Sequence, residues 1–321
     1  MSREHFFVTG AMGCIGSWVV RNLVENNTSV TTFDLSIDRH RLELIMPDDL
    51  LARINFIQGD LTNAEALKNS VVKSGATHII HLGGLQVPFC KENPSLGAAV
   101  NVMGTVNLFE AAKVAGIHQL VYASSIAIYG GPELYPTELL EHNSLPNPAT
   151  HYGVYKQANE GNANVYWYDD EIASIGLRPY TVYGPGRDQG MTSTPTQAML
   201  SAVQQTDYHI SFGGYNGFQY VDDIAKIFIQ SAYAEIKEAN VYNIRGAVAN
   251  MSEIVGAIGE ITPSVTVTYE DVSLPFPKGG DDTELRALLG EIPDTSLSEG
   301  VRKTMLHFES VITNGRLVLK L

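Results

Sequence analysis

The feature that most constrains the fold is a glycine-rich segment near the start of the chain. A short apolar run, His5–Val8, leads into the sequence T-G-A-M-G-C-I-G at positions 9–16, and a helical pattern over Ile15–Asn26 follows. Glycine at positions 10, 13 and 16 permits a sharp turn that lets backbone N–H groups approach a pyrophosphate at the positive end of the helix. The pattern G-x-x-G-x-x-G is one residue longer than the common dinucleotide fingerprint, and a purely structural glycine turn is the alternative.

Acidic residues follow the next two apolar runs. Asp34 comes directly after the second run, 18 positions beyond the last of these glycines. A carboxylate at this place accepts hydrogen bonds from an adenosine ribose and repels a 2′-phosphate, so it favours NAD over NADP. Arg39 and Arg41 lie nearby and keep NADP as an alternative. Asp60 and Leu61 follow the third run, and Asp60 is expected to reach the adenine edge.

Short apolar runs alternate with helical patterns over the first 180 residues. Continuous apolar runs are typical of strands buried on both faces, and strands that alternate with helices form βαβ units in a parallel sheet. The sequence therefore predicts an α/β fold with a Rossmann-type, doubly wound parallel sheet, in a NAD-binding domain over residues 1–180. The expected strands are His5–Val8, Val30–Phe33, Ile54–Ile57, His78–Leu82, Leu120–Ala123 and Ala173–Leu177, and the expected helices include Ile15–Asn26, Asn63–Lys73 and Pro94–Ala115.

The pattern loosens after Pro179, where turn clusters rich in glycine appear. Residues 218–248 are expected to return to the large sheet. Residues 181–217 and 249–321 are expected to form a smaller, interleaved C-terminal domain that binds the substrate, although the tail Val311–Leu321 has no interpretable pattern. The elements expected after residue 180 are a helix at Val221–Glu235 and strands at Val241–Ile244 and Val265–Tyr269.

Composition excludes several classes of protein. The chain has 321 residues, of which 44% are hydrophobic and 17% charged, which excludes a disordered or fibrous protein. Its net charge is −14 and it has no basic block, so neither nucleic acid nor an anionic membrane is an expected partner. The start lacks a signal-peptide core, and no run approaches the roughly 18 apolar residues of a membrane span. Cys14 and Cys90 are too few for a disulfide framework or a Cys-based zinc site. We expect a soluble, cytoplasmic protein without a metal.

Three polar side chains form the candidate catalytic group. Tyr152 and Lys156 are four residues apart in a helical stretch, so they share one helix face, although such a pair alone is also typical of an ordinary surface. A nearby ammonium lowers the pKa of a phenol, which can then exchange a proton with an alcohol or carbonyl oxygen. Ser125 follows the fifth strand, at the sheet edge where α/β proteins bind ligands, and is expected to hydrogen-bond the reacting oxygen. Ser124 is expected to bond local backbone instead.

Together these pieces resemble an extended short-chain dehydrogenase/reductase of the NAD-dependent epimerase/dehydratase family. The resemblance covers about residues 3–308, and the motifs occur in the family's order and at its intervals. The matching pieces are Thr9–Gly16, Asp34, Gly59-Asp60-Leu61, His81-Leu82-Gly83-Gly84, Asn101, Ser124-Ser125, Tyr152 with Lys156, Arg178-Pro179, Tyr220-Val221-Asp222-Asp223, Leu288-Leu289-Gly290 and Leu297-Ser298-Glu299-Gly300.

The resemblance implies a role for each matching position. Ser125, Tyr152 and Lys156 would be catalytic, and Lys156 would also bond the nicotinamide ribose. Asn101 would organise a helix and a water near Lys156. The cofactor would be NAD, with contacts from Gly10, Gly13, Cys14, Ile15, Gly16, Asp34, Asp60, Leu61, Leu82, Gly83, Gly84, Asn101, Tyr152, Lys156, Pro179 and Val182.

The resemblance also bears on assembly. Helices around Pro94–Ala115 and Tyr152–Asp169 commonly form the four-helix interface of a homodimer in this family. The expected partners are therefore a second copy of the chain and a small-molecule carbohydrate substrate.

Departures from the family pattern narrow the reaction. Ile126 and Ala127 stand where dehydratases carry an Asp-Glu pair and decarboxylases a Glu, so β-elimination by that mechanism is not expected. Asn216 and Gly217 stand where members that bind a diphosphate often have Arg-Asp, and a later R-x-G-D motif is K-G-G-D at 278–281. This weaker clamp favours a smaller substrate, a free sugar or a sugar acid.

Two further residues are candidates for the substrate side. Arg187, in a glycine-rich turn, is the expected anion contact and suits a carboxylate, with a solvated loop arginine as the alternative. Gln86 could hydrogen-bond a substrate hydroxyl, although a polar loop residue is the more common case. The resemblance and these departures from it together predict an oxidoreductase of carbohydrate metabolism, with Gln86, Ser125 and Arg187 on its substrate side. In it, Tyr152 acts as the general base while a hydride passes from a hydroxyl of a free sugar or sugar acid to NAD.

Two alternatives accompany this prediction. A nucleotide-sugar epimerase with tightly bound NAD would use the same three residues in both directions on one bound substrate. A non-catalytic, NAD-sensing regulator is a remote alternative, because such proteins often lose the tyrosine or lysine that this chain retains.

Overall fold

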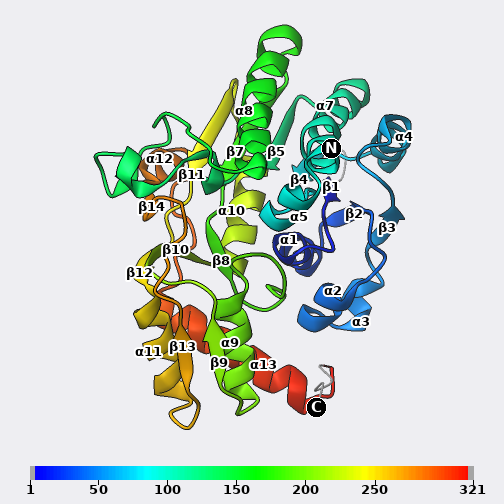
Figure 1. Ribbon diagram of the computed structural model, residues 1–321. Helices are drawn as coiled ribbons and strands as arrows, with labels where there is room; N and C mark the ends of the chain where they lie inside the picture. The colour runs from blue at the N-terminus through cyan, green and yellow to red at the C-terminus, as the bar shows by residue number, and fades with distance from the viewer. Residues whose placement is uncertain (1–3, 317–321) are drawn as a thin grey trace.

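The structure is a computed structural model that describes residues 4–316, in which seven parallel strands form a central sheet (Figure 1). The strand order is β11-β7-β5-β4-β1-β2-β3, so the order reverses between β1 and β4. Open α/β sheets bind ligands at such a reversal, beyond the carboxyl ends of the strands. The doubly wound parallel sheet predicted from the sequence is confirmed. Its strands are β1 (His5–Thr9), β2 (Ser29–Asp34), β3 (Asn55–Gln58), β4 (His78–His81), β5 (Gln119–Ala123), β7 (Ala173–Arg178) and β11 (Ala239–Asn243).

Helices cover both faces of this sheet. In β1, Phe6 and Val8 belong to the apolar cluster of α1 and α10, whereas Phe7 belongs to the cluster of α4, α7 and α8. Successive side chains of a strand point to opposite faces, so both sets are apolar, which explains the continuous apolar runs in the sequence. The covering helices are α1 (Cys14–Glu25) and α10 (Val221–Tyr233) on one face, and α4 (Ala64–Ser74), α7 (Gly104–Ala115) and α8 (His151–Asp170) on the other.

The stretch predicted as one helix over residues 94–115 consists of three pieces. A π-helical turn, η1 (Ala99–Met103), joins α6 (Pro94–Ala98) to α7. The turn places Asn101 inside the protein, where its amide Nδ2 donates to the Gly97 carbonyl oxygen at 3.0 Å. Such turns are frequent at functional sites, and this one borders the cavity described below.

A second set of elements lies beside the large sheet and, in Figure 1, below it. The strand β10 pairs antiparallel with β12 and parallel with β8. These strands and three helices surround a separate apolar core that includes Met199, Phe218, Ile254 and Met305. The elements are β8 (Thr181–Tyr183), β10 (Tyr215–Tyr220), β12 (Ala247–Asn250), α9 (Thr194–Val203), α11 (Met251–Ile261) and α13 (Leu297–Thr313).

Short elements complete the described chain. The strand β9 pairs with β13, and β6 pairs with β14, each as a two-stranded parallel sheet. The short elements are α2 (His40–Ile45), α3 (Asp48–Leu51), α5 (Val87–Glu92), the 3₁₀ turns η2 (Ile126–Ile128) and η3 (Pro132–Leu134), β6 (Leu139–Leu140), β9 (Tyr208–Ile210), β13 (Val267–Tyr269), β14 (Gly279–Gly280) and α12 (Thr283–Leu289).

The chain passes repeatedly between the two larger sheets. The strand β7 is followed by β8 of the smaller sheet, and α10 with β11 returns to the large sheet between β10 and β12. The division into domains at 1–180 with 218–248, and 181–217 with 249–321, stays a prediction. Residues 317–321 of the predicted tail lie outside the described residues, whereas Val311–Thr313 end α13. Within residues 4–316, no helix is both long and apolar enough to cross a membrane.

Candidate active site

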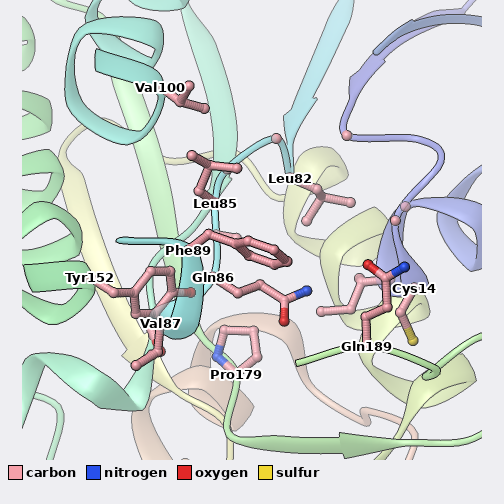
Figure 2. Close-up of a pocket in the computed structure, with 18 of the residues that line it drawn as sticks. Cys14, Leu82, Leu85, Gln86, Val87, Phe89, Val100, Tyr152, Pro179 and Gln189 are labelled. Atoms are coloured by element: carbon pink, nitrogen blue, oxygen red, sulfur yellow. The ribbon is translucent and has the colours of Figure 1, made fainter. Parts of the chain in front are cut away.

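A cavity of about 600 Å³ lies at the carboxyl edge of the large sheet, where the strand order reverses. Residues that follow β1, β2, β3, β4, β5 and β7 line it, together with Arg187, Gln189, Met191 and Thr192. Figure 2 shows Leu82, Gln86, Tyr152 and Pro179 around this cavity. Its size is that of a small-molecule site, for which volumes of roughly 300–1,000 Å³ are typical.

The glycine-rich segment that follows β1 forms one wall of the cavity. Gly10 has a φ of +68°, and a Cβ there would lie 2.5 Å from the Gly83 nitrogen. A Cβ on Gly16 would lie 2.1 Å from the Gly10 carbonyl oxygen, so neither position has room for a side chain. At Gly13 the closest atom would be 3.1 Å away, which is a milder restriction. The predicted cradle of close backbone approaches is present at Gly10 and Gly16.

Cys14 and Ile15 line the cavity at the start of α1 (Figure 2). No side chain in the described part of the chain caps this helix start, so its first N–H groups are available to an anion. Burial raises the pKa of the Cys14 thiol to about 11, although the positive charges of Arg187 and Arg41 oppose the shift. Cys14 is therefore a neutral wall residue.

Both predicted carboxylates line the cavity and are oriented by backbone N–H groups. Asp34 accepts hydrogen bonds from the Met12 nitrogen at 2.9 Å and from the Ser36 nitrogen at 3.0 Å. Asp60 Oδ1 accepts one from the Thr62 nitrogen at 2.8 Å. The bond from Met12 joins the Asp34 carboxylate at the end of β2 to the glycine-rich segment. The two regions predicted to contact the cofactor are thus hydrogen-bonded to each other.

Two arginines near Asp34 have other partners. The Arg39 guanidinium lies 3.7 Å from the centre of the Phe56 ring, a cation–π contact. Arg41 donates to the Met12 carbonyl oxygen at 2.7 Å and pairs with Asp188 at 2.5 Å. These engagements fit the preference for NAD over NADP that Asp34 predicts.

The segment after β4 contributes backbone rather than side chains. Leu82, Gly83 and Gly84 line the cavity. A Cβ on Gly84 would lie 2.5 Å from Asn101 Oδ1 and 3.7 Å from Lys156 Nζ. Asn101 itself lies behind the lining residues of the described chain, and its Oδ1 is buried there without a hydrogen-bond partner. Asn101 is therefore not placed to contact a cofactor directly, and its role near Lys156 stays a prediction.

The three predicted catalytic side chains all line the cavity. Tyr152 and Lys156 lie on the first turns of α8, whose Thr150 cap accepts the Gly153 N–H at 3.0 Å. Ser125 follows β5, and its Oγ accepts the Ala127 N–H at 3.1 Å. A phenol, a hydroxyl and an ammonium at one edge of the sheet can bind an alcohol or carbonyl oxygen and exchange a proton with it.

The expected effect of Lys156 on Tyr152 is wrong for this structure. Burial raises the pKa of Tyr152, and hydrogen bonding with Ser125 and the charge of Arg187 oppose this only in part. Lys156 Nζ lies 5.5 Å from the centre of the Tyr152 ring and donates to the Ala123 carbonyl oxygen at 2.6 Å. The ammonium is thus directed toward the backbone and the ring face. Burial also lowers the pKa of Lys156, to about 8.

The expectation for Ser124 is also wrong. Its hydroxyl donates at 2.5 Å to the carboxylate of Glu160, a buried residue of α8, rather than to local backbone. The reason is that Glu160 lies two helical turns beyond Tyr152 and reaches the end of β5. A carboxylate is a stronger acceptor than a carbonyl oxygen.

The predicted substrate residues occupy one side of the cavity. Gln86 lines it, and in Figure 2 its amide projects inward between Phe89 and Pro179. Arg187 also lines it, and its Nη2 donates to Thr192 at 2.8 Å. Its Nε is buried and has no partner among residues 4–316. Arg187 is a cavity-lining guanidinium with donors beyond the one that bonds Thr192, so it can hold an anionic ligand.

The positions that resemble a diphosphate clamp point elsewhere. Asn216 is fully buried, and its amide is directed to the Gly213 carbonyl oxygen at 3.3 Å. Lys278 pairs with Glu138 at 2.5 Å. Neither Asn216 nor Lys278 is among the described residues that line the cavity, so Arg187 is the cation that the substrate side offers.

Several lining residues were not singled out from the sequence. Tyr180 and Phe276 form an edge-to-face pair with ring centres 6.2 Å apart, and both line the cavity. Tyr180 adjoins Pro179, which the motif had already marked, so its position was a usable signal. Phe276 and Gln189 come from segments without a motif, and only the tertiary fold brings them to the site.

Comparison with known proteins identifies the family. The model of the NAD dependent epimerase/dehydratase family matches residues 6–244. A UDP-glucose 4-epimerase of Mycolicibacterium smegmatis is 28% identical over 322 residues, which cover 94% of this chain and 98% of that protein. The similarity therefore extends through both sheets.

Solved structures show the same architecture. The UDP-glucose 4-epimerase of Thermus thermophilus, in complex with NAD, has a TM-score of 0.82 and 25% identity, with 95% of this chain and 98% of that chain covered. A partial consensus L-threonine 3-dehydrogenase has a TM-score of 0.84 and 22% identity, with 95% and 99% covered, and shows the fold alone. Epimerases and dehydrogenases share this fold, so the chemistry has to be decided from the site.

Proposed function

The chain belongs to the NAD-dependent epimerase/dehydratase family, and we propose that it is a dehydrogenase of a free sugar or sugar acid. The charge on the substrate side of the cavity is the observation that carries this proposal. The Arg187 guanidinium lines that side, whereas Asn216 and Lys278 are engaged elsewhere. One guanidinium matches one carboxylate well, but a diphosphate needs more positive charge.

The residues of the cofactor side fit NAD. Gly10 and Gly16 have no room for a Cβ, and the start of α1 has free N–H groups that suit a pyrophosphate. Asp34 stands where a carboxylate accepts hydrogen bonds from ribose hydroxyls. Lys156 would bond the nicotinamide ribose, and Pro179 with Val182 would flank the nicotinamide ring. When bound, NAD supplies the acceptor for a hydride.

The proton of the reaction passes through Tyr152. In the oxidation, the phenolate of Tyr152 takes the proton of the substrate hydroxyl while Ser125 Oγ hydrogen-bonds the same oxygen. In the reverse direction Tyr152 returns the proton. Burial raises the pKa of Tyr152, so the free protein holds this phenol protonated near neutral pH. Its anion becomes more populated as the pH rises, and oxidation should therefore accelerate.

NADH formation tests the proposal directly. The purified protein is given NAD with a panel of free sugars, uronic acids and UDP-sugars, and NADH is followed by absorbance. Steady NADH formation from a free sugar or sugar acid is the expected result. The control is Tyr152→Phe, which removes only the hydroxyl and should lower turnover at least about 100-fold while the affinity for NAD is kept.

A nucleotide-sugar epimerase is the second candidate. The similarity to a UDP-glucose 4-epimerase over nearly the whole chain favours it. An epimerase reoxidises its own cofactor, so it would retain NAD through purification. Conversion of a UDP-sugar to its epimer without net NADH, by protein that carries NAD as isolated, would replace the dehydrogenase proposal.

We further propose a cytoplasmic homodimer formed through α6, η1 and α8. Leu96, Met103, Val154, Val165 and Tyr168 on these elements are between 46% and 78% exposed, an unusual density of exposed apolar side chains. Both cysteines are free, which fits a reducing compartment. The family resemblance, which implies a four-helix interface around Pro94–Ala115 and Tyr152–Asp169, supports this proposal.

Light scattering during gel filtration tests this assembly. Val165→Glu should convert the dimer to a monomer, because it would bury a charge at the interface. Val272→Glu is the matched control, since Val272 is 63% exposed and lies outside these helices. A wild-type monomer, or a Val165→Glu protein that is still dimeric, would contradict this interface.

A further inference from the structure

A buried ion pair lies directly behind the catalytic group. Arg178 at the end of β7 donates to both carboxylate oxygens of Glu160, from Nε to Oε1 at 2.8 Å and from Nη2 to Oε2 at 2.7 Å. The side chains of Arg178 and Glu160 are only 3% and 10% exposed. Neither is among the cavity's lining residues in the described chain, so the pair acts on the site only through other groups.

The third nitrogen of the Arg178 guanidinium is also used. Its Nη1 donates to the Tyr129 hydroxyl at 2.7 Å, to the His142 carbonyl oxygen at 2.6 Å and to Asn243 Oδ1 at 3.3 Å. Transferring two charges out of water is costly, and buried ion pairs can often be replaced by apolar side chains without loss of stability. Stability alone is therefore a weak reason for such a complete network.

At the sheet edge, the pair joins two strand ends. Ser124 Oγ donates to Glu160 Oε1 at 2.5 Å, and Ser124 directly precedes Ser125. Arg178 directly precedes Pro179 of the cavity wall. One carboxylate thus holds the end of β5, which carries Ser125, and the end of β7.

On α8, the same carboxylate shares a face with the catalytic side chains. Glu160 stands four residues after Lys156 and eight after Tyr152, about one and two helical turns along. Both oxygens of Glu160 are held by Arg178, so the helix cannot rotate or slide without breaking this pair. The position of Tyr152 relative to Ser125 depends on that constraint.

We propose that Glu160 is a positioning residue that, through Arg178 and Ser124, holds the ends of β5 and β7 against α8 and sets the geometry between Ser125 and the Tyr152–Lys156 face. The inference rests on the proposed function only for its turnover measurement. It holds for any reaction in which Ser125 and Tyr152 bind the same oxygen.

The charge of Glu160 gives the proposal a second readout. The Lys156 ammonium faces Cys90 of α5, His81 of β4, and Glu160 and Tyr152 of α8. Burial raises the pKa of the Cys90 thiol and lowers that of His81 to about 3, so both are neutral near pH 7. Cys90 and Glu160 are the neighbours whose negative charge raises the pKa of Lys156, and with Cys90 neutral, loss of the Glu160 charge should lower that pKa below about 8.

Three variants separate positioning from stability. Glu160→Gln removes the charge and leaves Arg178 buried and unpaired, which should lower the melting temperature strongly. Arg178→Met should destabilise the protein for the mirrored reason. The double variant Glu160→Leu with Arg178→Met removes both charges and should recover most of the melting temperature, because a well-packed apolar pair replaces the ion pair.

The double variant then decides the question. We expect kcat about 100-fold below that of the wild type, with a smaller change in KM, and a lower titration midpoint of Lys156. The midpoint is followed by NMR of ¹³C-labelled lysine, with the Lys156 signal assigned by its loss in Lys156→Met. A double variant that recovers melting temperature, kcat and the Lys156 midpoint together would show that the pair is only structural. If the wild type oxidises no compound in the panel, the proposed function fails, and the lysine titration still tests the role of Glu160.

Discussion

Along the cofactor side of the cavity, Gly10 and Gly16 bring backbone atoms so close together that no side chain fits. The catalytic and substrate side depends on charged side chains: Lys156 on α8 is buried, Arg187 beyond β8 is half-buried, and the neighbouring Asp188 is exposed. The first side is restricted by steric exclusion, which neither pH nor salt can change. The second is restricted by electrostatics, which both can change.

This difference separates what is general in the site from what is particular. A backbone cradle and a helix start recognise a pyrophosphate in any protein that builds them. Charged side chains on loops are placed one by one, and their exchange changes the ligand without changing the fold. Substitutions on the two sides should therefore differ in size and in their response to pH and salt.

Gly10→Ala should have the largest effect. The new Cβ would lie 2.5 Å from the Gly83 nitrogen, on a residue whose φ of +68° disfavours alanine. Left-handed strain and overpacking together should cost about 2–5 kcal/mol, divided between folding and NAD binding. NAD titration and urea denaturation at two pH values and two salt concentrations measure this loss.

Gly13→Ala is the matched control in the same segment. Its Cβ would meet the Gly10 carbonyl oxygen at 3.1 Å, and its φ of −77° suits any residue. It should retain most of the NAD affinity. If Gly10→Ala is as mild as Gly13→Ala, or if its effect depends on salt, then steric exclusion does not govern this side.

Lys156→Met should stabilise the folded protein near neutral pH, by an amount that depends on pH. Burial lowers the pKa of Lys156 from 10.5 to about 8, so the folded state carries a penalty for its charge below pH 8, and the penalty disappears as the pH rises toward 10.5. The free energy of unfolding of the wild type should therefore rise relative to that of Lys156→Met by at most about 3 kcal/mol between pH 7 and pH 10.5.

Urea denaturation of both proteins across that range measures the difference. All other titrating groups are shared, so they cancel in the comparison. Parallel curves for the wild type and Lys156→Met would show that Lys156 keeps its ordinary pKa. The electrostatic account of this side of the cavity would then fail at its most buried group.

The same contrast explains what the sequence could predict. The strands of the large sheet were predictable because burial on both faces leaves continuous apolar runs, and β1 ends one residue beyond the predicted His5–Val8. The glycine positions were predictable because a backbone contact tolerates one residue type. The π turn at η1 was missed, because it depends on Asn101 and its bond to the Gly97 carbonyl oxygen rather than on periodicity.

Long-range side-chain partners were the part that sequence could not supply. Ser124 was assigned to backbone, since its partner Glu160 lies 36 residues away. Arg41 was considered only as a sign of NADP, because its partner Asp188 lies 147 residues away. The spacing of Glu160 four residues after Lys156 was a usable signal, but spacing on one helix does not reveal what the other element offers.

Arg187→Lys should have an intermediate effect, on the substrate alone. Lysine keeps the charge but loses the planar guanidinium, which can bond Thr192 and a carboxylate at the same time. A hydrogen bond to a charged group contributes about 1.5–3 kcal/mol, so KM for a sugar acid should rise roughly 10- to 100-fold. KM for the matching neutral sugar should not change. If NAD affinity falls instead of KM rising, Arg187 belongs to the cofactor side.

Asp188→Asn should have the smallest effect and the strongest dependence on salt. Asp188 pairs with Arg41 and His40 of α2, and Arg41 also bonds the Met12 carbonyl oxygen, so Asp188 fastens the substrate-side segment to the cofactor-side loop. The Asp188 side chain is 42% exposed, and ion pairs of that kind contribute about 0.2–1 kcal/mol. The dissociation rate of NADH should therefore rise by no more than about five-fold.

Stopped-flow release of NADH, measured at low and at high salt, tests this clasp between the two sides. Salt screens exposed charges, so the rate difference between Asp188→Asn and the wild type should disappear at high salt. Glu65→Gln is the matched control, because it breaks an exposed ion pair with Lys68 on α4, outside the residues that line the cavity. A rate difference that persists at high salt would mean that Asp188 holds the segment through its shape and hydrogen bonds, and the electrostatic description would then be limited to Lys156 and Arg187.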